Sequence, residues 1–254
     1  MKKGIVVIVL FLVGFAAFMA NDLRSYKYPE LNKCFKATVS GKTLCNKSMD
    51  YVQLSRVSPY FLEAVIMSED DKFYYHNGFD WKEFKNSLLV NLRKFSFVRG
   101  GSTITQQLVK NVYLDQSKSI SRKVKEAYIA NQIEGRYSKK LILEKYVNAI
   151  QFGKGLWGIK EAADFYFGVH PEDLGVLESL YLVILLPSPV KYSASYRNDK
   201  LTDYQKRRIK RLLKRLKKRG DVDPDYADFL EEDIENFPWG GKSLMEEEPL
   251  DHEI

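Results

Sequence analysis

The chain has 254 residues, of which 45% are hydrophobic and 29% are charged, and its formal net charge is +7. Two cysteines and three histidines, one of them in the C-terminal tail, do not make a convincing zinc site. No internal repeat is visible. Beyond its N-terminal segment the chain is long enough to bury one good core.

The N-terminal segment is typical of a membrane anchor. Lys2 and Lys3 precede a 16-residue apolar run, Ile5–Ala20. The run is near the short end for a spanning helix, so signal peptide and signal anchor both remain open. Cleavage after Ala20 would place Phe18 at the −3 position, where a small residue is usual. We therefore expect residues 1–24 to form a cytoplasmic stub and an uncleaved transmembrane anchor, with the N-terminus in the cytoplasm.

Residues 25–57 are expected to be a linker that holds a hairpin. Cys34 and Cys45 flank the stretch FKATVSGKTL, and Thr38–Gly41 can form a four-residue turn that sets the two cysteines opposite each other. In an oxidising compartment they should be bridged. Two free, buried thiols are the alternative.

The first helix of the following domain carries a candidate general base. Pro59 opens a helical pattern, and Glu69 continues its apolar side, which consists of Phe61, Leu62, Val65 and Ile66. A carboxylate among apolar side chains loses hydration, which raises its pKa toward the range where a general base works. The alternative is a solvated residue at the end of a helix. A loop, Asp70–Asp80, containing His76 follows.

Residues 87–98 form a second apolar segment, SLLVNLRKFSFV, with two charged residues. Core packing is the default expectation for such a run.

The stretch GGSTITQQLVKN, Gly100–Asn111, predicts a helix with a ligand-binding face. Thr103 and Gln106 read as a capping box. Ile104, Leu108 and Val112 form the apolar stripe, and the other face carries Thr103, Gln106, Gln107 and Lys110. Free amides at a helix N-terminus, with a lysine further on, favour an anionic ligand. An ordinary capped surface helix is the alternative.

A basic cluster lies further along the chain. Lys118, Arg122 and Lys123 precede Glu126 in a helix that should end near Gly135. Arg122 lies one turn before Glu126, so an i,i+4 ion pair is the simplest explanation of this spacing. Ser138 should cap the next helix.

Charge separates sharply near the C-terminus. Residues 206–219 carry ten basic and no acidic residues, and residues 220–254 carry one basic and 13 acidic residues. A narrow apolar stripe should pack on the body of the domain, and it consists of Ile209, Leu212, Leu213 and Leu216. The basic remainder can lie against anionic headgroups. The acidic tail, 220–254, is expected to be largely unfolded.

Several motifs occur in order and together resemble one family. These are EDDKFYYHNGFDW (69–81), GGSTITQQLVKN (100–111), RKVKEAYIANQIEGRYSKKLILEKYVN (122–148), AADFYFG (162–168) and LESLYLVILLPSPVKYS (177–193). They resemble the motifs of the family-51 glycosyltransferases, which polymerise lipid II into peptidoglycan. The resemblance covers residues 58–200. Ser188-Pro189-Val190-Lys191 spells S-x-x-K without a following transpeptidase motif, so we expect the monofunctional type.

The resemblance implies roles for particular residues. Glu69 would be the general base on the 4-hydroxyl of the acceptor sugar. Glu126 would be a second acidic residue near the donor pyrophosphate, with positioning through a divalent cation, Mg²⁺ or Mn²⁺, left open. The implied substrate-binding residues are His76, Thr103, Gln106, Gln107, Lys110, Asn111, Lys118, Arg122 and Lys123.

The resemblance also implies a fold and a location. Residues 58–219 should form a mainly α, lysozyme-like, two-lobed domain on the extracytoplasmic face of the bacterial inner membrane. Segment 87–98 would dip into the bilayer surface. The implied partners are lipid II, the growing glycan strand, the membrane and other cell-wall synthesis proteins, with no nucleic acid.

Two other classes of protein remain as alternatives. A lysozyme-like hydrolase or lytic transglycosylase needs a carboxylic acid at the leaving oxygen and gives Lys110 no role, whereas a leaving pyrophosphate needs positive charge instead. A non-enzymatic, basic membrane-surface protein would use residues 206–219 and leave Glu69 without a role.

Overall fold

The computed structural model describes residues 28–94, 100–115, 117, 119–237 and 239, together with the single positions 14, 21 and 23. The fold is mainly helical, as the sequence predicted. Within these ranges, no helix is both long enough and apolar enough to cross a membrane. The anchor predicted for residues 1–24 lies outside them, apart from the three single positions.

The elements follow one another in a chain of short helices with two small hairpins. They are β1 (Phe35–Lys36), β2 (Thr43–Leu44), η1 (Leu54–Arg56), α2 (Pro59–Glu69), η2 (Phe73–Tyr75), α3 (Trp81–Arg93), α4 (Ile104–Val112), α5 (Ile120–Glu134), α6 (Lys139–Ala149), β3 (Gln151–Gly153), β4 (Leu156–Trp157), α7 (Ile159–Phe167), η3 (Pro171–Asp173), α8 (Val176–Leu185), α9 (Pro189–Tyr192), α10 (Ala194–Arg197), α11 (Asp203–Arg219) and α12 (Pro224–Asp233). Both strand pairs are antiparallel.

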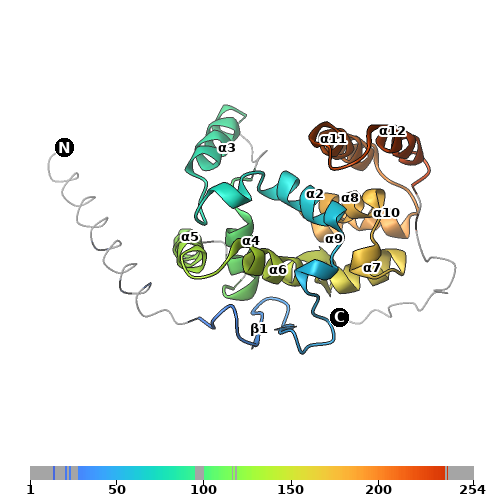
Figure 1. Ribbon diagram of the computed structural model, residues 1–254. Helices are drawn as coiled ribbons and strands as arrows, with labels where there is room; N and C mark the ends of the chain where they lie inside the picture. Colours follow the sequence, from blue (N-terminus) through green and yellow to red (C-terminus); the bar gives the residue numbers. More distant parts are fainter. Residues whose placement is uncertain are drawn as a thin grey trace, which may run out of the picture.

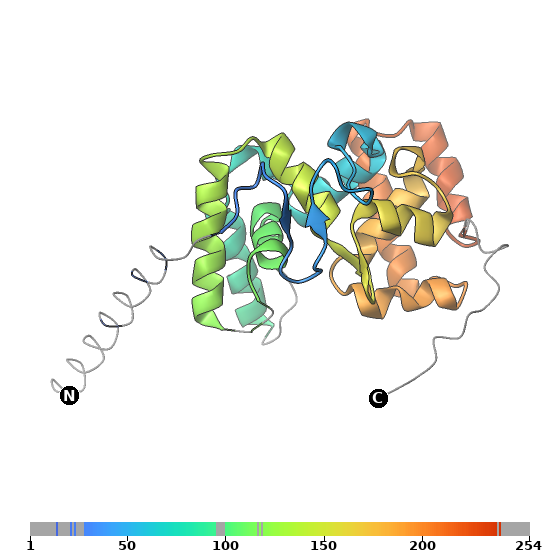
Figure 2. The same cartoon turned by 90° about the horizontal axis from the view of Figure 1, so that it is seen from below.

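Two groups of helices make up the body. Helices α3, α4 and α5 gather at one end and α7 to α12 at the other, with α2 and α6 in the middle (Figures 1 and 2). Helix α8 is the centre of the larger group, and every residue in it except Glu178 is buried. A helix that is apolar all round must be covered on all sides. Helices α2, α9 and α11 pack against α8 and provide much of this cover.

Side-chain caps fix where the helices begin, as the sequence predicted. Thr103 and Gln106 form the capping box of α4, and the Ser138 hydroxyl accepts a hydrogen bond from the Leu141 amide at the start of α6. Helix α5 ends at Glu134, and Gly135 follows as its C-cap. These local signals place three helices that surround the candidate site.

The predicted hairpin and disulfide are present. Cys34 and Cys45 are bonded, with their Cα atoms 4.6 Å apart, and Phe35 pairs with Leu44 in the antiparallel ladder. The segment is more than a linker, because the Thr38 amide donates to the Val112 carbonyl (2.9 Å) at the end of α4. Its apolar side chains also join the core, including Leu31, Ala37, Leu44, Val52, Leu54 and Val57.

The prediction of an unfolded acidic tail was wrong for its first part. Residues 224–233 form α12, and Asp223 caps its N-terminus. Ala227, Leu230 and Ile234 are buried at an i, i+3, i+7 spacing, which is enough to hold an otherwise acidic helix on the body. Residues 240–254 lie outside the described part of the chain.

Of the two expectations for residues 87–98, core packing was wrong where it can be checked. Helix α3 covers residues 87–93, and Ser87 is its one buried residue. Leu88, Leu89 and Leu92 are exposed, with Leu92 reaching 60%. An apolar run indicates that its side chains avoid water, but it does not show whether the protein core or a bilayer covers them. Residues 95–99 lie outside the described ranges.

Candidate active site

Glu69 is the last residue of α2. The Asp70 amide still donates to the Ile66 carbonyl (2.9 Å), but the Asp70 backbone then leaves the helix. The Asp70 side chain turns back and accepts a hydrogen bond from the Ile104 amide (3.0 Å) at the start of α4. This contact ties the end of α2 to the beginning of α4 and fixes where Glu69 lies.

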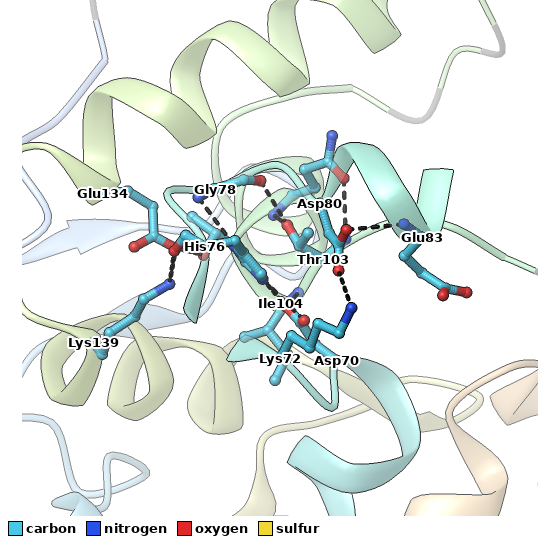
Figure 3. A network of polar contacts seen from close by, with 12 residues as sticks. Asp70, Lys72, His76, Gly78, Asp80, Glu83, Thr103, Ile104, Glu134 and Lys139 are labelled. Carbon is cyan, nitrogen blue, oxygen red and sulfur yellow. Dashed lines mark hydrogen bonds and ion pairs between the residues drawn. The ribbon is translucent and has the colours of Figure 1, made fainter. Parts of the chain in front are cut away.

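His76 and Thr103 hold the loop between α2 and α3 in place (Figure 3). His76 Nε2 lies 2.9 Å from both carboxylate oxygens of Asp70, and His76 Nδ1 accepts from the Gly78 amide (3.2 Å). The proton therefore belongs on Nε2. The Thr103 hydroxyl donates to the Gly78 carbonyl (2.8 Å). Both side chains were predicted to bind substrate, but their polar atoms are used within the protein.

A chain of hydrogen bonds orients the Glu69 carboxylate. Gln107 Nε2 donates to Glu69 Oε2 (3.0 Å), and the buried Tyr146 hydroxyl donates to Gln107 Oε1 (3.2 Å). The ionised Glu69 carboxylate only accepts, so the NH₂ group of Gln107 must face it, and the Tyr146 hydroxyl satisfies the amide oxygen on the other side. Ser68 donates to the other carboxylate oxygen (3.3 Å). The sequence did not single out Tyr146, since its contact with α4 is long-range.

The Glu69 carboxyl has a perturbed pKa. The side chain is half-buried, and the loss of hydration raises its pKa above the usual range for a glutamate. The hydrogen bond from Gln107 and the positive charges of Arg208 and Lys110 act in the opposite direction. The predicted desolvation of this carboxylate is therefore present. The influence of Arg208, on α11, was not anticipated.

Glu126 lies in a separate, cationic cluster. It is buried, with 1% of its surface exposed, and one oxygen is 3.4 Å from Arg122 Nη1 while the other contacts Lys123 Nζ. Lys123 Nζ also donates to the Ser102 hydroxyl (2.8 Å), which joins α5 to the turn before α4. The predicted i,i+4 pair between Arg122 and Glu126 is present. Arg122 Nε is buried and has no hydrogen-bond partner among the described residues.

Lys110 links the two carboxylates electrostatically. Its side chain reaches solvent, yet the surrounding protein removes enough hydration to lower its pKa. Glu126 and Glu69 both act to raise that pKa, while Lys123 and Arg122 lower it. The Lys110 ammonium, on the exposed face of α4, therefore interacts electrostatically with both carboxylates.

The remaining predicted site residues have different surroundings. Gln106 is buried in the capping box, and its Nε2 has no partner among the described residues. Asn111 Nδ2 donates to the Ala149 carbonyl (3.3 Å) at the end of α6. Lys118 lies outside the described residues. The polar face of α4 predicted from its sequence is therefore divided, with Gln107 and Lys110 at the site and Thr103 and Gln106 inside.

The cluster does not fit the divalent cation left open at Glu126. Both of its carboxylate oxygens contact cationic side chains. In the part of the chain that the structure describes, no three His, Cys, Asp or Glu side chains gather as a metal site would require.

Comparison with known proteins identifies the family. A family model described as Transglycosylase matches residues 37–217. The chain belongs to the transglycosylase family. The match begins within the hairpin and runs almost to the end of α11, so it is wider than the resemblance seen in the motifs.

Individual relatives carry related names. A biosynthetic peptidoglycan transglycosylase from Aromatoleum aromaticum is 44% identical over 147 residues, which is 58% of this chain and 64% of that protein. One of the same name from Acinetobacter baumannii is 38% identical over 65% of this chain and 72% of its own length. Penicillin-binding protein 1A of Aquifex aeolicus is 37% identical over 69% of this chain and 24% of its own length. The chain thus spans just under two thirds of the first of these relatives.

Proposed function

We propose that this transglycosylase polymerises lipid II into linear β-1,4 glycan strands of peptidoglycan. The donor would be a glycan linked to a polyprenyl pyrophosphate, and the acceptor would be the 4-hydroxyl of a second lipid-linked disaccharide. The family match and the names of the relatives support this reaction class. The arrangement of one oriented carboxylate and a separate cationic cluster supports it on chemical grounds.

Glu69 is the proposed general base. A new bond forms between the acceptor O4 and the donor C1, and the bond from C1 to the pyrophosphate oxygen breaks. The acceptor proton passes to Glu69, and attack opposite the leaving group inverts the anomeric centre. A raised pKa makes Glu69 a stronger base, while Gln107 and the nearby cations favour the ionised form that can accept the proton. General-base help of this kind is worth roughly 10²–10⁴ in rate.

The cationic cluster is the proposed site for the leaving pyrophosphate. Lys110, Arg122 and Lys123 would supply charge where the leaving group becomes more negative. Arg122 Nε, which is buried and has no hydrogen-bond partner in the described part of the chain, is a donor that a phosphate oxygen could satisfy. Glu126 would hold Arg122 and Lys123 in position. Four other predicted residues would hold the backbone that carries these groups through hydrogen bonds within the protein. They are His76, Thr103, Gln106 and Asn111.

The observation that carries the proposal is the double pairing of Glu126. A hydrolase or lytic transglycosylase needs a carboxylic acid that protonates the leaving oxygen. Glu126 has a cation at each oxygen, and a hydrolase that works with a single acid would give this cationic cluster no role. A pyrophosphate leaves as an anion and needs only the positive charge that this cluster offers.

We propose an extracytoplasmic location at the bacterial inner membrane, with residues 1–24 as a single-pass anchor. The disulfide between Cys34 and Cys45 supports this side of the membrane, because such bonds persist in oxidising compartments. The exposed apolar face of α3 supports contact with the bilayer in which lipid II resides. The two groups of helices are consistent with a lysozyme-like, two-lobed domain. Other cell-wall synthesis proteins are proposed as partners by family resemblance alone.

Incubation of the purified protein with lipid II tests the function. We expect glycan polymer, and we expect moenomycin to inhibit its formation, as the family membership implies. Release of fragments from finished peptidoglycan without polymer would instead favour the hydrolase. Vesicle binding without either activity would favour a non-enzymatic membrane protein.

A further inference from the structure

Helix α11 has four faces around its axis, each with different surroundings. The inward face is apolar and buried, as predicted, and consists of Ile209, Leu212, Leu213 and Leu216 with Gln205. At 100° per residue, the basic side chains then divide among the other three faces. Two of those faces contact neighbouring helices, and the third points away from the body.

The two flanking faces have their charges neutralised. On the α12 side, Lys206 and Lys210 pair with Glu235, and Lys217 pairs with Asp228. On the α2 side, Arg215 pairs with Asp71 and also donates to the Met67 carbonyl. Arg219 pairs with Glu63 on the same side. Arg208 shares that side, one turn before Leu212, and acts on Glu69. These residues therefore serve the fold and the site.

The outward face carries the remaining basic residues, Arg207, Arg211, Lys214 and Lys218. Their spacing of four, three and four residues places them in one row that extends about 16 Å along the helix. All four side chains are partly or fully open to solvent, and none forms an ion pair with another described residue. Their ammonium and guanidinium groups are therefore available to an external anion.

The position of this row favours a flat anionic surface. Helices α3 and α11 both project from the side of the molecule opposite the β1–β2 hairpin (Figure 1). On α3, Trp81 and Leu92 are 74% and 60% exposed. Apolar side chains that enter a bilayer and basic side chains that meet its headgroups are complementary anchors. Helix α12, which packs beside α11, carries exposed acids such as Asp225 and Glu232, so the basic row does not continue onto it.

We propose that Arg207, Arg211, Lys214 and Lys218 form a binding surface for anionic phospholipid headgroups. The surface would hold the α11 end of the domain against the membrane while α3 holds the other end. Each basic residue near an anionic leaflet favours association by about fivefold. This inference goes beyond the proposed reaction, because none of the four residues belongs to the Glu69 or Glu126 clusters.

A fluorescent label on α11 can test the proposal in the full chain. Because Cys34 and Cys45 are bonded to each other, an Asp203→Cys substitution provides a single reactive thiol at the start of α11. A polarity-sensitive dye is attached there, and the protein is reconstituted into phosphatidylcholine vesicles with or without phosphatidylglycerol. We expect a blue shift that needs phosphatidylglycerol and weakens as salt is added.

Two sets of substitutions, each removing four charges, decide the outcome. Changing Arg207, Arg211, Lys214 and Lys218 to Gln should abolish the shift. The matched control changes Lys36, Lys47, Lys140 and Lys154, which are exposed elsewhere, and should keep the shift. Both variants should polymerise lipid II in detergent, which separates this proposal from the proposed function. An equal shift without phosphatidylglycerol, or a shift that survives in the first variant, would overturn the proposal. A shift that appears only when an acidic protein or a nucleic acid is added would also overturn it.

Discussion

Glu69 and Glu126 are both carboxylates near basic side chains, but their surroundings give them different chemistry. Glu69 accepts neutral hydrogen bonds from Gln107 and Ser68 and loses hydration, and its cations act from a distance. Glu126 contacts Arg122 and Lys123 directly. The first arrangement suits a group that takes up a proton, and the second suits a group that holds cations.

Arg208 should set part of the pH dependence. A positive charge near Glu69 favours its ionised form, so Arg208→Gln should raise the pKa of Glu69. The base would then become protonated at higher pH, and the acid limb of the rate profile should move upward. Arg207→Gln removes the same charge from the outward face of α11 and is the control. Polymerisation rates across pH measure both. Identical acid limbs for the two variants would show that Arg208 does not act on the base.

Burial of Glu69 should also cost stability at neutral pH. Its pKa is raised in the folded state, so the unfolded chain loses this proton at lower pH than the folded chain does. The protonated Glu69 carboxyl adds to the free energy of unfolding. This stabilisation is complete below the unfolded pKa of about 4.3 and is lost as the pH rises through the folded pKa. The uncharged Glu69→Gln variant should therefore melt at a higher temperature than the parent at pH 7. Thermal unfolding at pH 7 and pH 4 measures the difference, and an advantage that does not shrink in acid would contradict this account.

At the scale of elements, the turn between α2 and α3 depends on close approach of backbones. Gly78 has a φ of +83°, and a Cβ there would lie 2.9 Å from backbone atoms of Ala130 on α5. The Thr103 hydroxyl and the His76 ring also bind the Gly78 backbone. The loop can bring these groups together because residue 78 has no side chain.

Gly78→Ala should therefore destabilise the protein strongly. The left-handed backbone costs about 1–2 kcal/mol for a non-glycine residue, and overpacking against Ala130 adds about 1–3 kcal/mol. Gly41→Ala is the control, because Gly41 has a φ of +69° but a Cβ there meets nothing within 4 Å. It should cost only the backbone strain. Denaturant unfolding compares the two, and equal losses would mean that contact with α5 is unimportant.

Local signals predicted the elements well and their contacts less well. The caps at Thr103 and Ser138 and the helix end at Gly135 depend on residues within four positions, so the sequence shows them directly. The Glu69–Gln107 hydrogen bond joins residues 38 apart. The role of Arg208 requires α11 to pack on α2. No local sequence pattern predicts these long-range contacts.

Composition misled the prediction at two elements. Acidic residues outnumber basic ones after residue 220, yet three buried side chains hold α12 on the body. The apolar residues of α3 made core packing the default expectation, but Leu88, Leu89 and Leu92 are exposed. The charge and the apolar content of a segment describe that segment alone, whereas its burial depends on what packs beside it.

At the scale of the whole molecule, the candidate site lies where separate parts of the chain meet. Glu69 comes from α2, Gln107 and Lys110 from α4, and Glu126 from α5. The hairpin secures the end of α4 through Thr38, and α11 secures the end of α2 through Arg215. The terminal segments of the domain therefore hold the site in position from both sides.

Paired substitutions at Glu69 and Lys110 test the central claim most directly. Glu69→Gln keeps the shape and removes the basicity, so it should bind a donor analogue as the parent does and lose nearly all polymerisation of lipid II. Lys110→Ala removes charge from the proposed pyrophosphate site, so donor binding and turnover should both fall, the latter by about 10²–10³. Lys140→Ala, an exposed lysine on α6, should change neither. If Glu69→Gln folds, binds the donor analogue and still polymerises lipid II, Glu69 is not the base and the account is wrong.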